Sequence, residues 1–223
     1  MAFKYSIWYS LFGKYVYAGL THFYRQIKVN GVENIPLDKP VIFAANHQNA
    51  FLDPLVISYK MPLQPYFVVR ADVFKSSLMA NFFNSVKMIP IYRIRDGFSS
   101  LQKNDEIMDK IQGLLERGES VIIFCEGSHA EEDYLRPLKK GMARMIHSIL
   151  FKNKGEVFPM IVPVGIHYRS KFDIPTDVCV NFGKAINPNQ FFEENENPQK
   201  FYTKINSIIY EALSNEMIDI GEF

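Results

Sequence analysis

Short apolar runs rich in branched and aromatic residues alternate along the chain with longer segments in which apolar positions recur every three or four residues. The short runs have the length and composition of strands, and the longer segments have the period of helices. The predicted strands are Gln26–Asn30, Pro40–Ala45, Tyr66–Val69, Ser120–Phe124, Met160–His167 and Val178–Phe182. The predicted helices are Val73–Val86, Asn104–Arg117, Lys140–Phe151 and Pro198–Glu216. This alternation predicts a single α/β domain in which helices flank a mostly parallel or mixed central sheet.

The first 27 residues differ from the rest because their apolar face is unusually aromatic. When residues are stepped at about 100° each, one broad side of a helix collects the apolar residues. They are Tyr5, Trp8, Tyr9, Phe12, Tyr15, Val16, Leu20, Phe23 and Ile27, while Lys14 and Arg25 lie opposite. Such a helix suits the membrane interface, although the same face can instead pack on the protein core. We therefore divide the chain into an amphipathic helical segment at 1–27 and a domain at 28–223.

The composition limits the classes of function. A chain of 223 residues that is 48% hydrophobic can bury one continuous core. Its 25 basic and 24 acidic residues nearly cancel, which argues against a dedicated nucleic-acid binder. Cys125 and Cys179 form no Cys-x-x-Cys pair, which favours a reducing compartment and argues against structural zinc or a disulfide scaffold. No apolar run reaches the ~18 residues of a membrane span, so we expect a peripheral or monotopic protein.

The first candidate for chemistry follows the predicted strand Val41–Ala45, which ends abruptly at a polar segment running from Asn46 and His47 to Asp53. Ligands of open α/β sheets bind at the carboxyl ends of strands. A loop that turns into a helix would bring the Asp53 carboxylate to the His47 imidazole. That contact would fix the tautomer and leave the other ring nitrogen to take a proton. The simpler alternative is a surface histidine before a helix capped by asparagine.

A second polar break follows the apolar strand Val121–Phe124 and contains Glu126, Gly127, Ser128 and His129. Glycine allows a ligand to approach the backbone closely, and serine with exposed amides can bind phosphate or an oxyanion. Basic residues follow near the start of the next helix, at Arg136, Lys139, Lys140 and Arg144. Such a cluster either contacts phosphate or forms a solvated face.

Two further segments add candidates. Lys87–Arg93 is an apolar stretch that ends in Arg93, a residue able to bind phosphate in a bidentate manner. Ile161–Ile166 is apolar and broken by Pro163, which favours an edge strand or a strand that lines a site.

Taken in this order, the segments resemble the PlsC-type glycerolipid acyltransferase superfamily, which includes lysophosphatidate and glycerol-3-phosphate acyltransferases. The resemblance spans about 25–186 and is carried by the Asn-His…Asp, Ile-Pro-Ile-Tyr-Arg, Phe-x-Glu-Gly-Ser and Val-Pro-Val blocks. Four ordered matches are far more specific than one motif. The sequence departs from the family pattern twice. Five residues instead of four separate His47 from Asp53, and His129 stands where an arginine is usual.

The resemblance implies that His47, oriented by Asp53, deprotonates an acceptor hydroxyl, which attacks the thioester of acyl-CoA or an acyl carrier protein directly. It implies a glycerol phosphate acceptor, lysophosphatidate or glycerol-3-phosphate, and no cofactor or metal. The residues expected to bind substrate are Asn46, Arg93, Glu126, Gly127, Ser128, His129, Lys139 and Lys140. We accordingly expect an enzyme of phospholipid biosynthesis at the cytoplasmic face of a membrane.

Two alternatives to this interpretation remain. His47, Asp53, Glu126 and His129 offer nitrogen and oxygen ligands for a metal-dependent hydrolase, although their spacing matches no metal motif. The aromatic first helix and the altered spacing also suit a catalytically silent lipid-binding protein.

Overall fold

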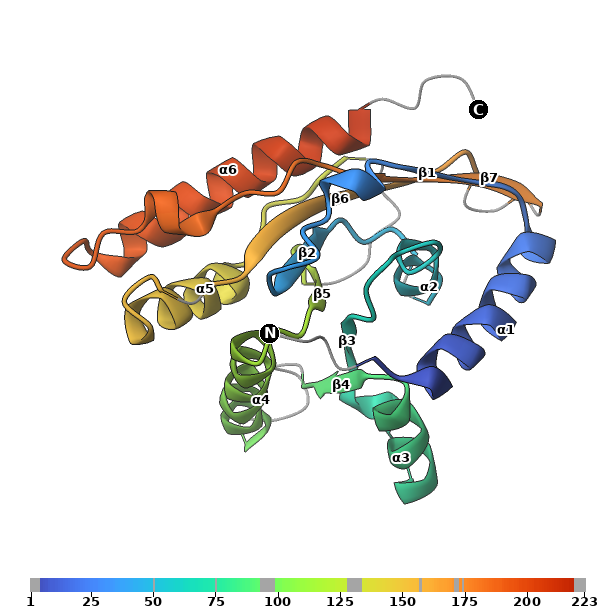
Figure 1. Ribbon diagram of the computed structural model, residues 1–223, viewed down its shortest axis with the longest axis horizontal. Coiled ribbons are helices and arrows are strands. Elements are labelled where there is room, and N and C mark those ends of the chain that lie inside the picture. Colours follow the sequence, from blue (N-terminus) through green and yellow to red (C-terminus); the bar gives the residue numbers. More distant parts are fainter. Residues whose placement is uncertain are drawn as a thin grey trace.

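The computed structural model describes residues 5–49, 51–74, 76–92, 99–127, 134–156, 158–170, 173 and 175–218, and at 70, 99–105 and 218 only the backbone. Its centre is a seven-stranded sheet with helices on both faces (Figure 1). The strands are β1 (Tyr24–Asn30), β2 (Val41–Ala45), β3 (Tyr66–Arg70), β4 (Met88–Ile91), β5 (Val121–Phe124), β6 (Met160–Tyr168) and β7 (Thr176–Phe182). They lie in the order β1-β7-β6-β2-β5-β3-β4, and only the β6–β7 pair is antiparallel. The predicted α/β architecture with a mostly parallel, mixed sheet is confirmed.

Helices occupy the connections between most of these strands. They are α1 (Ile7–Phe23), α2 (Asp53–Ile57), α3 (Ser77–Ser85), α4 (Ser99–Glu116), α5 (Lys140–Lys152) and α6 (Pro198–Ile218). Short 3-10 turns lie at Val32–Asn34, Ala71–Val73 and Pro188–Phe191. Helix α3 begins later than its apolar period predicts, because the Ser76 side chain accepts the Met79 N–H and caps the helix there.

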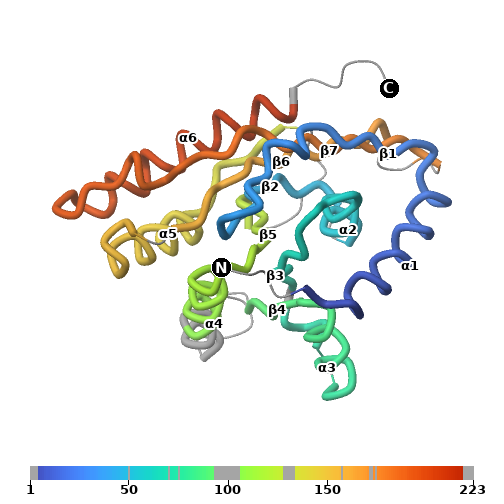
Figure 2. Tube along the Cα trace, in the orientation of Figure 1, coloured from blue at the N-terminus to red at the C-terminus, as the bar shows by residue number. Residues whose placement is uncertain are grey.

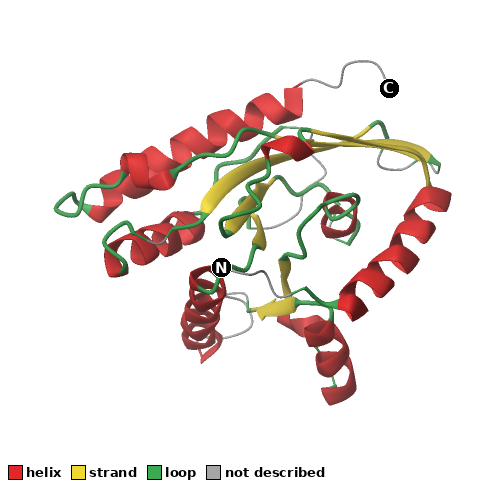
Figure 3. Cartoon of the chain, viewed as in Figure 1, coloured by secondary structure: helices red, strands yellow, loops and turns green. Residues whose placement is uncertain are grey.

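The core consists of two apolar layers, one on each face of the sheet. Helices cover both of these layers (Figure 3). Strand β2 contributes to both layers, because alternate side chains of a strand point to opposite faces. Ile42 and Ala44 pack with α4, α5 and α6, whereas Val41, Phe43 and Ala45 pack with α1 and α2. All five β2 residues are fully buried, so the loop that follows β2 starts from a fixed point in the molecule.

Strand β6 lies between β7 and β2, which excludes the first of the two alternatives for Pro163, an edge strand, and leaves the second, a strand that lines a site. Proline has no N–H to donate, which normally excludes it from the interior of a sheet. Here Pro163 lies at the end of the β6–β7 ladder, which begins one residue later with the pair Val164 and Phe182. The Pro163 carbonyl accepts the N–H of Gly183, a residue beyond β7. A proline is tolerated at this position because the ladder requires no donor there.

Helix α1 crosses one face of the molecule, from the side of β3 and α3 to the outer strand β1 (Figure 2). Its residues Tyr9 and Leu20 are buried against the sheet, and the Tyr17 hydroxyl donates to the Ser58 carbonyl at the end of α2. The helix ends at Phe23, so Ile27 lies on β1 and not on the helical face predicted for it. No helix in the described ranges is long and apolar enough to cross a bilayer.

Helix α6 packs so closely on β6 that a side chain has no room between them. A methyl group added at Gly165 would lie 2.3 Å from the carbonyl oxygen of Glu216. Asn181 of β7 donates to the same carbonyl at 2.9 Å, which holds the end of α6 in place. The backbone of β6 therefore forms part of the packing surface for α6.

We predict that Gly165→Ala destabilises the fold by about 1–3 kcal/mol, because an overpacked contact forces the backbone to shift. The midpoint of thermal unfolding should fall by several degrees. Gly19→Ala is the matched control, since a methyl group at that α1 position meets nothing within 4 Å and should be neutral or stabilising. Equal midpoints for Gly165→Ala and the wild type would contradict the close contact between α6 and β6.

Candidate active site

The first polar loop begins where β2 ends. His47 lies two residues beyond Ala45, and Asp53 is the first residue of α2. His47 Nδ1 lies 2.8 Å from Asp53 Oδ2. The same carboxylate oxygen accepts the backbone N–H groups of Gln48 and Asn49, each at 2.8 Å. The five-residue spacing therefore still allows the carboxylate to reach the imidazole.

The environment of this pair suits proton transfer by His47. Asp53 has no exposed surface, and the His47 side chain is 13% exposed. The imidazole lies face to face with the Phe124 ring, with centroids 3.9 Å apart and an interplanar angle of 17°. Because Nδ1 faces a carboxylate, it carries the proton of the neutral ring and the basic lone pair lies on Nε2. This is the arrangement of a general base oriented by an acid.

The second polar loop lies beside the first, because Ala45 and Phe124 are partners in the β2–β5 ladder. Glu126 Oε1 accepts the backbone N–H of His47 at 3.0 Å. Its other oxygen, Oε2, accepts from Arg136 Nε at 2.6 Å. The buried Glu126 carboxylate thus joins the backbone of the candidate base to a guanidinium group.

Comparison with known sequences identifies the family. A family model described as Acyltransferase matches residues 26–167, a range that includes both polar loops. The chain belongs to the PlsC-type glycerolipid acyltransferase superfamily.

Relatives of this superfamily match limited parts of the chain. Glycerol-3-phosphate O-acyltransferase 2 of Saccharomyces cerevisiae is 32% identical over 100 residues, which are 39% of this chain and 14% of that protein. The chloroplastic 1-acyl-sn-glycerol-3-phosphate acyltransferases BAT2 of Brassica napus and LPAT1 of Arabidopsis thaliana are each 28% identical, over 51% and 53% of this chain. Those matches cover 31% and 32% of the two plant proteins. The chain therefore spans less than a third of the length of these relatives.

A solved structure shares the fold across nearly the entire chain. The crystal structure of the 1-acyl-sn-glycerophosphate acyltransferase PlsC from Thermotoga maritima superimposes with a TM-score of 0.64 at 17% identity. The match covers 96% of this chain and 81% of the Thermotoga protein. The acyltransferase fold thus includes the long helix α6, which the family model does not reach.

Three predicted substrate-binding residues lie outside the described residues. They are Arg93, Ser128 and His129, and the last of these stands where the superfamily usually has an arginine. Gly127, which precedes them, has a φ of 75° and therefore adopts a left-handed conformation that glycine favours. A methyl group at Gly127 would lie 3.0 Å from Cγ of Lys139. The aliphatic part of the Lys139 side chain therefore crosses the second loop at its glycine.

Lys139 and Lys140 take different directions although they are neighbours. The Lys139 N–H donates to the Cys125 carbonyl at 2.8 Å, which anchors this residue beside the second loop. Lys140 Nζ donates to Gln199 Oε1 of α6 at 3.3 Å. Of the two predicted phosphate ligands, Lys139 is thus the one in contact with the second loop.

Asn46 lies within the scaffold of the site. Its side chain has no exposed surface and forms two hydrogen bonds with the backbone of Ile166 on β6. Asn46 Nδ2 donates to the Ile166 carbonyl at 2.9 Å, and Oδ1 accepts the Ile166 N–H at 2.7 Å. The amide therefore joins the end of β2 to β6, and its full burial leaves no surface for the predicted contact with substrate.

Tyr168, the last residue of β6, belongs to the site although it was not among the predicted site residues. Its hydroxyl donates to Asp53 Oδ1 at 2.6 Å. Burial and the adjacent Asp53 carboxylate raise the pKa of the Tyr168 phenol well above its ordinary value, so the hydroxyl stays protonated and acts as a donor. The only available signal was that β6 ends at the same edge of the sheet as β2.

Cys125 lies at the start of the second loop but is unsuited to nucleophilic catalysis. The residue is buried, and burial raises the pKa of its thiol to about 12. Because the thiolate is the reactive species, a thiol with this pKa is inert near neutral pH. Within the described residues, no group of three or more His, Cys, Asp or Glu side chains could hold a metal ion.

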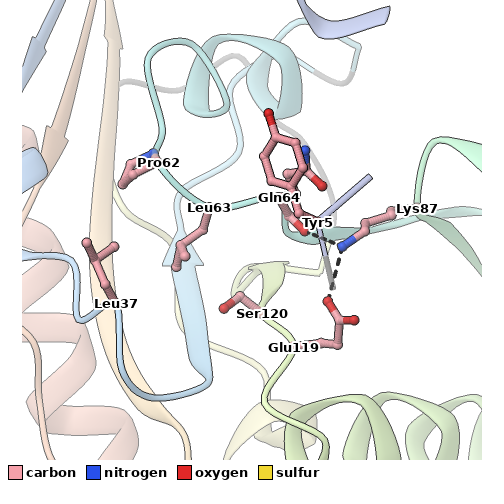
Figure 4. A pocket seen from close by; sticks show the side chains of 8 residues that line it. All are labelled: Tyr5, Leu37, Pro62, Leu63, Gln64, Lys87, Glu119 and Ser120. Atoms are coloured by element: carbon pink, nitrogen blue, oxygen red, sulfur yellow. Dashed lines mark hydrogen bonds and ion pairs between the residues drawn. The ribbon is translucent and has the colours of Figure 1, made fainter. Parts of the chain in front are cut away.

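The best-formed pocket in the described part of the chain lies at the other end of the strands (Figure 4). Its volume is about 230 Å³, and its lining residues precede β2, β3, β4 and β5. Lys87 Nζ donates there to Glu119 Oε2 at 3.1 Å and to the Gln64 carbonyl at 2.9 Å. Since β2 to β5 are parallel to one another, this pocket and His47 lie at opposite edges of the sheet. The pocket is therefore separate from the candidate active site.

Proposed function

We propose that the protein transfers a fatty acyl group from acyl-CoA or an acyl carrier protein to a hydroxyl of a glycerol phosphate acceptor, lysophosphatidate or glycerol-3-phosphate. The observation that carries the proposal is the 2.8 Å contact between His47 and the buried Asp53 in a member of this superfamily. No cofactor or metal enters the proposed reaction.

The mechanism follows from the placement of the basic nitrogen. Nε2 of His47 takes the proton of the acceptor hydroxyl while its oxygen attacks the thioester carbonyl. The tetrahedral intermediate collapses as the carbon–sulfur bond breaks, and the imidazolium returns the proton to the leaving thiolate. Asp53 holds the ring and stabilises its positive charge during these steps. The acyl group passes directly to the acceptor in this proposal. Among the described residues, the buried thiol of Cys125 in the second loop is inert near neutral pH and forms no covalent intermediate.

We predict that His47→Ala lowers turnover by about 10²–10⁴, the usual contribution of a general base. Asp53→Asn should also lower turnover, because the amide can present an N–H to Nδ1 and favour the wrong tautomer. The measurement is release of free thiol from an acyl thioester in the presence of each phosphate-bearing acceptor.

Unfolding curves of both variants are the control for the fold. Near-wild-type turnover in a purified His47→Ala protein would overturn the mechanism. An absence of acyl transfer by the wild-type protein with every donor and acceptor would instead favour the silent lipid-binding alternative.

We propose that the acceptor phosphate is bound by Arg93 and Lys139 together with the second loop. The structural support concerns Lys139, which crosses Gly127 in the loop that also holds the backbone of His47. A phosphate bound there would lie close to the base and would present the neighbouring hydroxyl to it. Glu126 would contribute indirectly, since both of its oxygens already have partners.

We predict that Arg93→Ala and Lys139→Ala each raise the Michaelis constant for the acceptor by about tenfold and change that for the donor less. Arg93→Lys should restore part of the effect, because lysine keeps the charge and loses the bidentate geometry. Lys140→Ala should have the smaller effect of the two lysine variants, since Lys140 bonds to α6. Equal changes for donor and acceptor would contradict the assignment.

We propose further that α1 and α3 together place the enzyme on the cytoplasmic face of a membrane, as a peripheral or monotopic protein. Half of the large apolar side chains that are exposed in the described ranges lie on these two helices. They form the α1/α3 surface, which consists of Ile7, Trp8, Leu11, Tyr15, Leu78, Met79 and Phe82. Neither helix contains an acidic residue, so nothing on them repels an anionic lipid headgroup.

Direct contacts make the α1/α3 surface continuous. Trp8 Nε1 donates to Ser85 Oγ at 3.1 Å. The Phe12 and Phe82 rings meet edge to face with their centroids 5.5 Å apart. Amphipathic aromatic rings of this kind favour the boundary between headgroups and acyl chains.

We predict that Leu11→Ser with Tyr15→Ser weakens flotation with vesicles that contain anionic phospholipid, because both side chains are more than half exposed. Turnover of a short-chain, water-soluble acceptor should remain. Phe151→Ser on α5 is the matched control, since Phe151 is 55% exposed and lies outside the α1/α3 surface. Unchanged flotation together with a large loss of thermal stability would show that Leu11 and Tyr15 support the core instead.

A further inference from the structure

A buried tyrosine forms the third member of the His47 and Asp53 pair. Asp53 Oδ2 accepts from His47 and from two backbone N–H groups. Its other oxygen, Oδ1, accepts from the hydroxyl of Tyr168 at 2.6 Å. Within the described ranges, no second donor is found at Oδ1. The tyrosine therefore completes the hydrogen bonding of a carboxylate that has no exposed surface.

The position of Tyr168 is fixed by the sheet. The residue pairs with Val178 in the β6–β7 ladder, and its ring packs against that of Tyr24 with centroids 6.1 Å apart. Only 4% of Tyr168 is exposed, so its hydroxyl requires a partner inside the protein. A phenylalanine would fill the same apolar space, which means that packing alone does not explain a tyrosine.

The hydrogen bond from Tyr168 to Asp53 affects the position of the base, His47. If Oδ1 lost its donor, a buried carboxylate oxygen would be left without a hydrogen bond, and the carboxylate would rotate toward other donors. Rotation of the carboxylate would move Oδ2, which fixes the plane and the tautomer of the His47 ring. Misplacement of a base by a fraction of an ångström is costly in turnover even when substrates still bind.

We propose that Tyr168 is a positioning residue that holds the Asp53 carboxylate in the orientation required by His47. It acts through Asp53 and contacts no reacting atom. The proposal rests on the proposed function for its kinetic consequence, whereas its structural consequence can be measured on the resting protein.

The first test compares Tyr168→Phe with the wild type by proton NMR, where a histidine N–H bonded to a carboxylate gives a separate downfield signal. In Tyr168→Phe, the signal of His47 Nδ1–H should move or disappear through faster exchange with water. The NMR test requires no substrate, so it remains decisive even if the protein transfers no acyl groups. A signal that coincides with that of the wild type would overturn the proposal.

The second test is kinetic. Tyr168→Phe should lower kcat about tenfold and leave the Michaelis constants for donor and acceptor nearly unchanged. The matched control is Tyr17→Phe, which also removes a partly buried hydroxyl bonded to the segment of α2, at the Ser58 carbonyl. It should lower thermal stability to a similar extent without changing kcat or the His47 signal. Equal kcat values for Tyr168→Phe and Tyr17→Phe would assign Tyr168 a structural role only.

The third test uses a double variant. In an Asp53→Asn background the partner of the tyrosine has lost its charge, so adding Tyr168→Phe should reduce kcat by less than twofold. A full tenfold reduction in that background would show that Tyr168 acts independently of Asp53, contrary to the proposal.

Discussion

Asp53 has no exposed surface, and a carboxylate in such a place keeps its charge only if hydrogen bonds replace the lost water. Four donors meet this requirement, namely the His47 ring, the backbone of Gln48 and Asn49, and the Tyr168 hydroxyl. Three of these donors belong to the loop after β2, and the tyrosine ends β6. The need to solvate one buried charge therefore determines the path of the first loop, the plane of the imidazole and the identity of a residue 115 positions away.

The second loop depends on this arrangement, since Glu126 is bonded to the backbone N–H of the residue that Asp53 orients. Ion pairs with buried members are sensitive to the loss of either partner, because the remaining charge is left without compensation. Arg136 and Glu126 thus belong to the support of the base as well as to its electrostatic surroundings. Asn46 strengthens the same region through two bonds to the β6 backbone.

Six of the seven strands, the α/β architecture and the placement of His47 near Asp53 were accessible from sequence, because an apolar run, an abrupt polar break or a short spacing marks each of them locally. Strand β4 was not among the predicted strands, since its four residues were recognised only as part of an apolar stretch that ends at Arg93. Tyr168 was not accessible, since nothing local distinguishes a tyrosine that ends a strand from one that only fills space. The sequence left the position of β6 open between an edge strand and a strand that lines a site, because proline is acceptable at the end of a ladder and sequence does not reveal where a ladder ends. The helical period of α1 could not show which of its aromatic residues pack on the core and which stay exposed. Aromatic residues serve equally well against a core or a lipid surface. Arg93, Ser128 and His129 lie outside the described residues and stay predictions.

Strand β1 pairs with β7, so the partners of residues 24–30 lie at 176–181. Contacts of such long sequence separation form late, because a large loop must close before they are gained. During synthesis, α1 is complete well before β7 and most of the sheet beneath it exist. For that interval the helix exposes to solvent the aromatic residues that it later buries as well as those that stay exposed. If α1 binds a lipid surface as proposed, the chain presents its largest apolar surface to the membrane before the domain folds, and attachment would then precede completion of the domain.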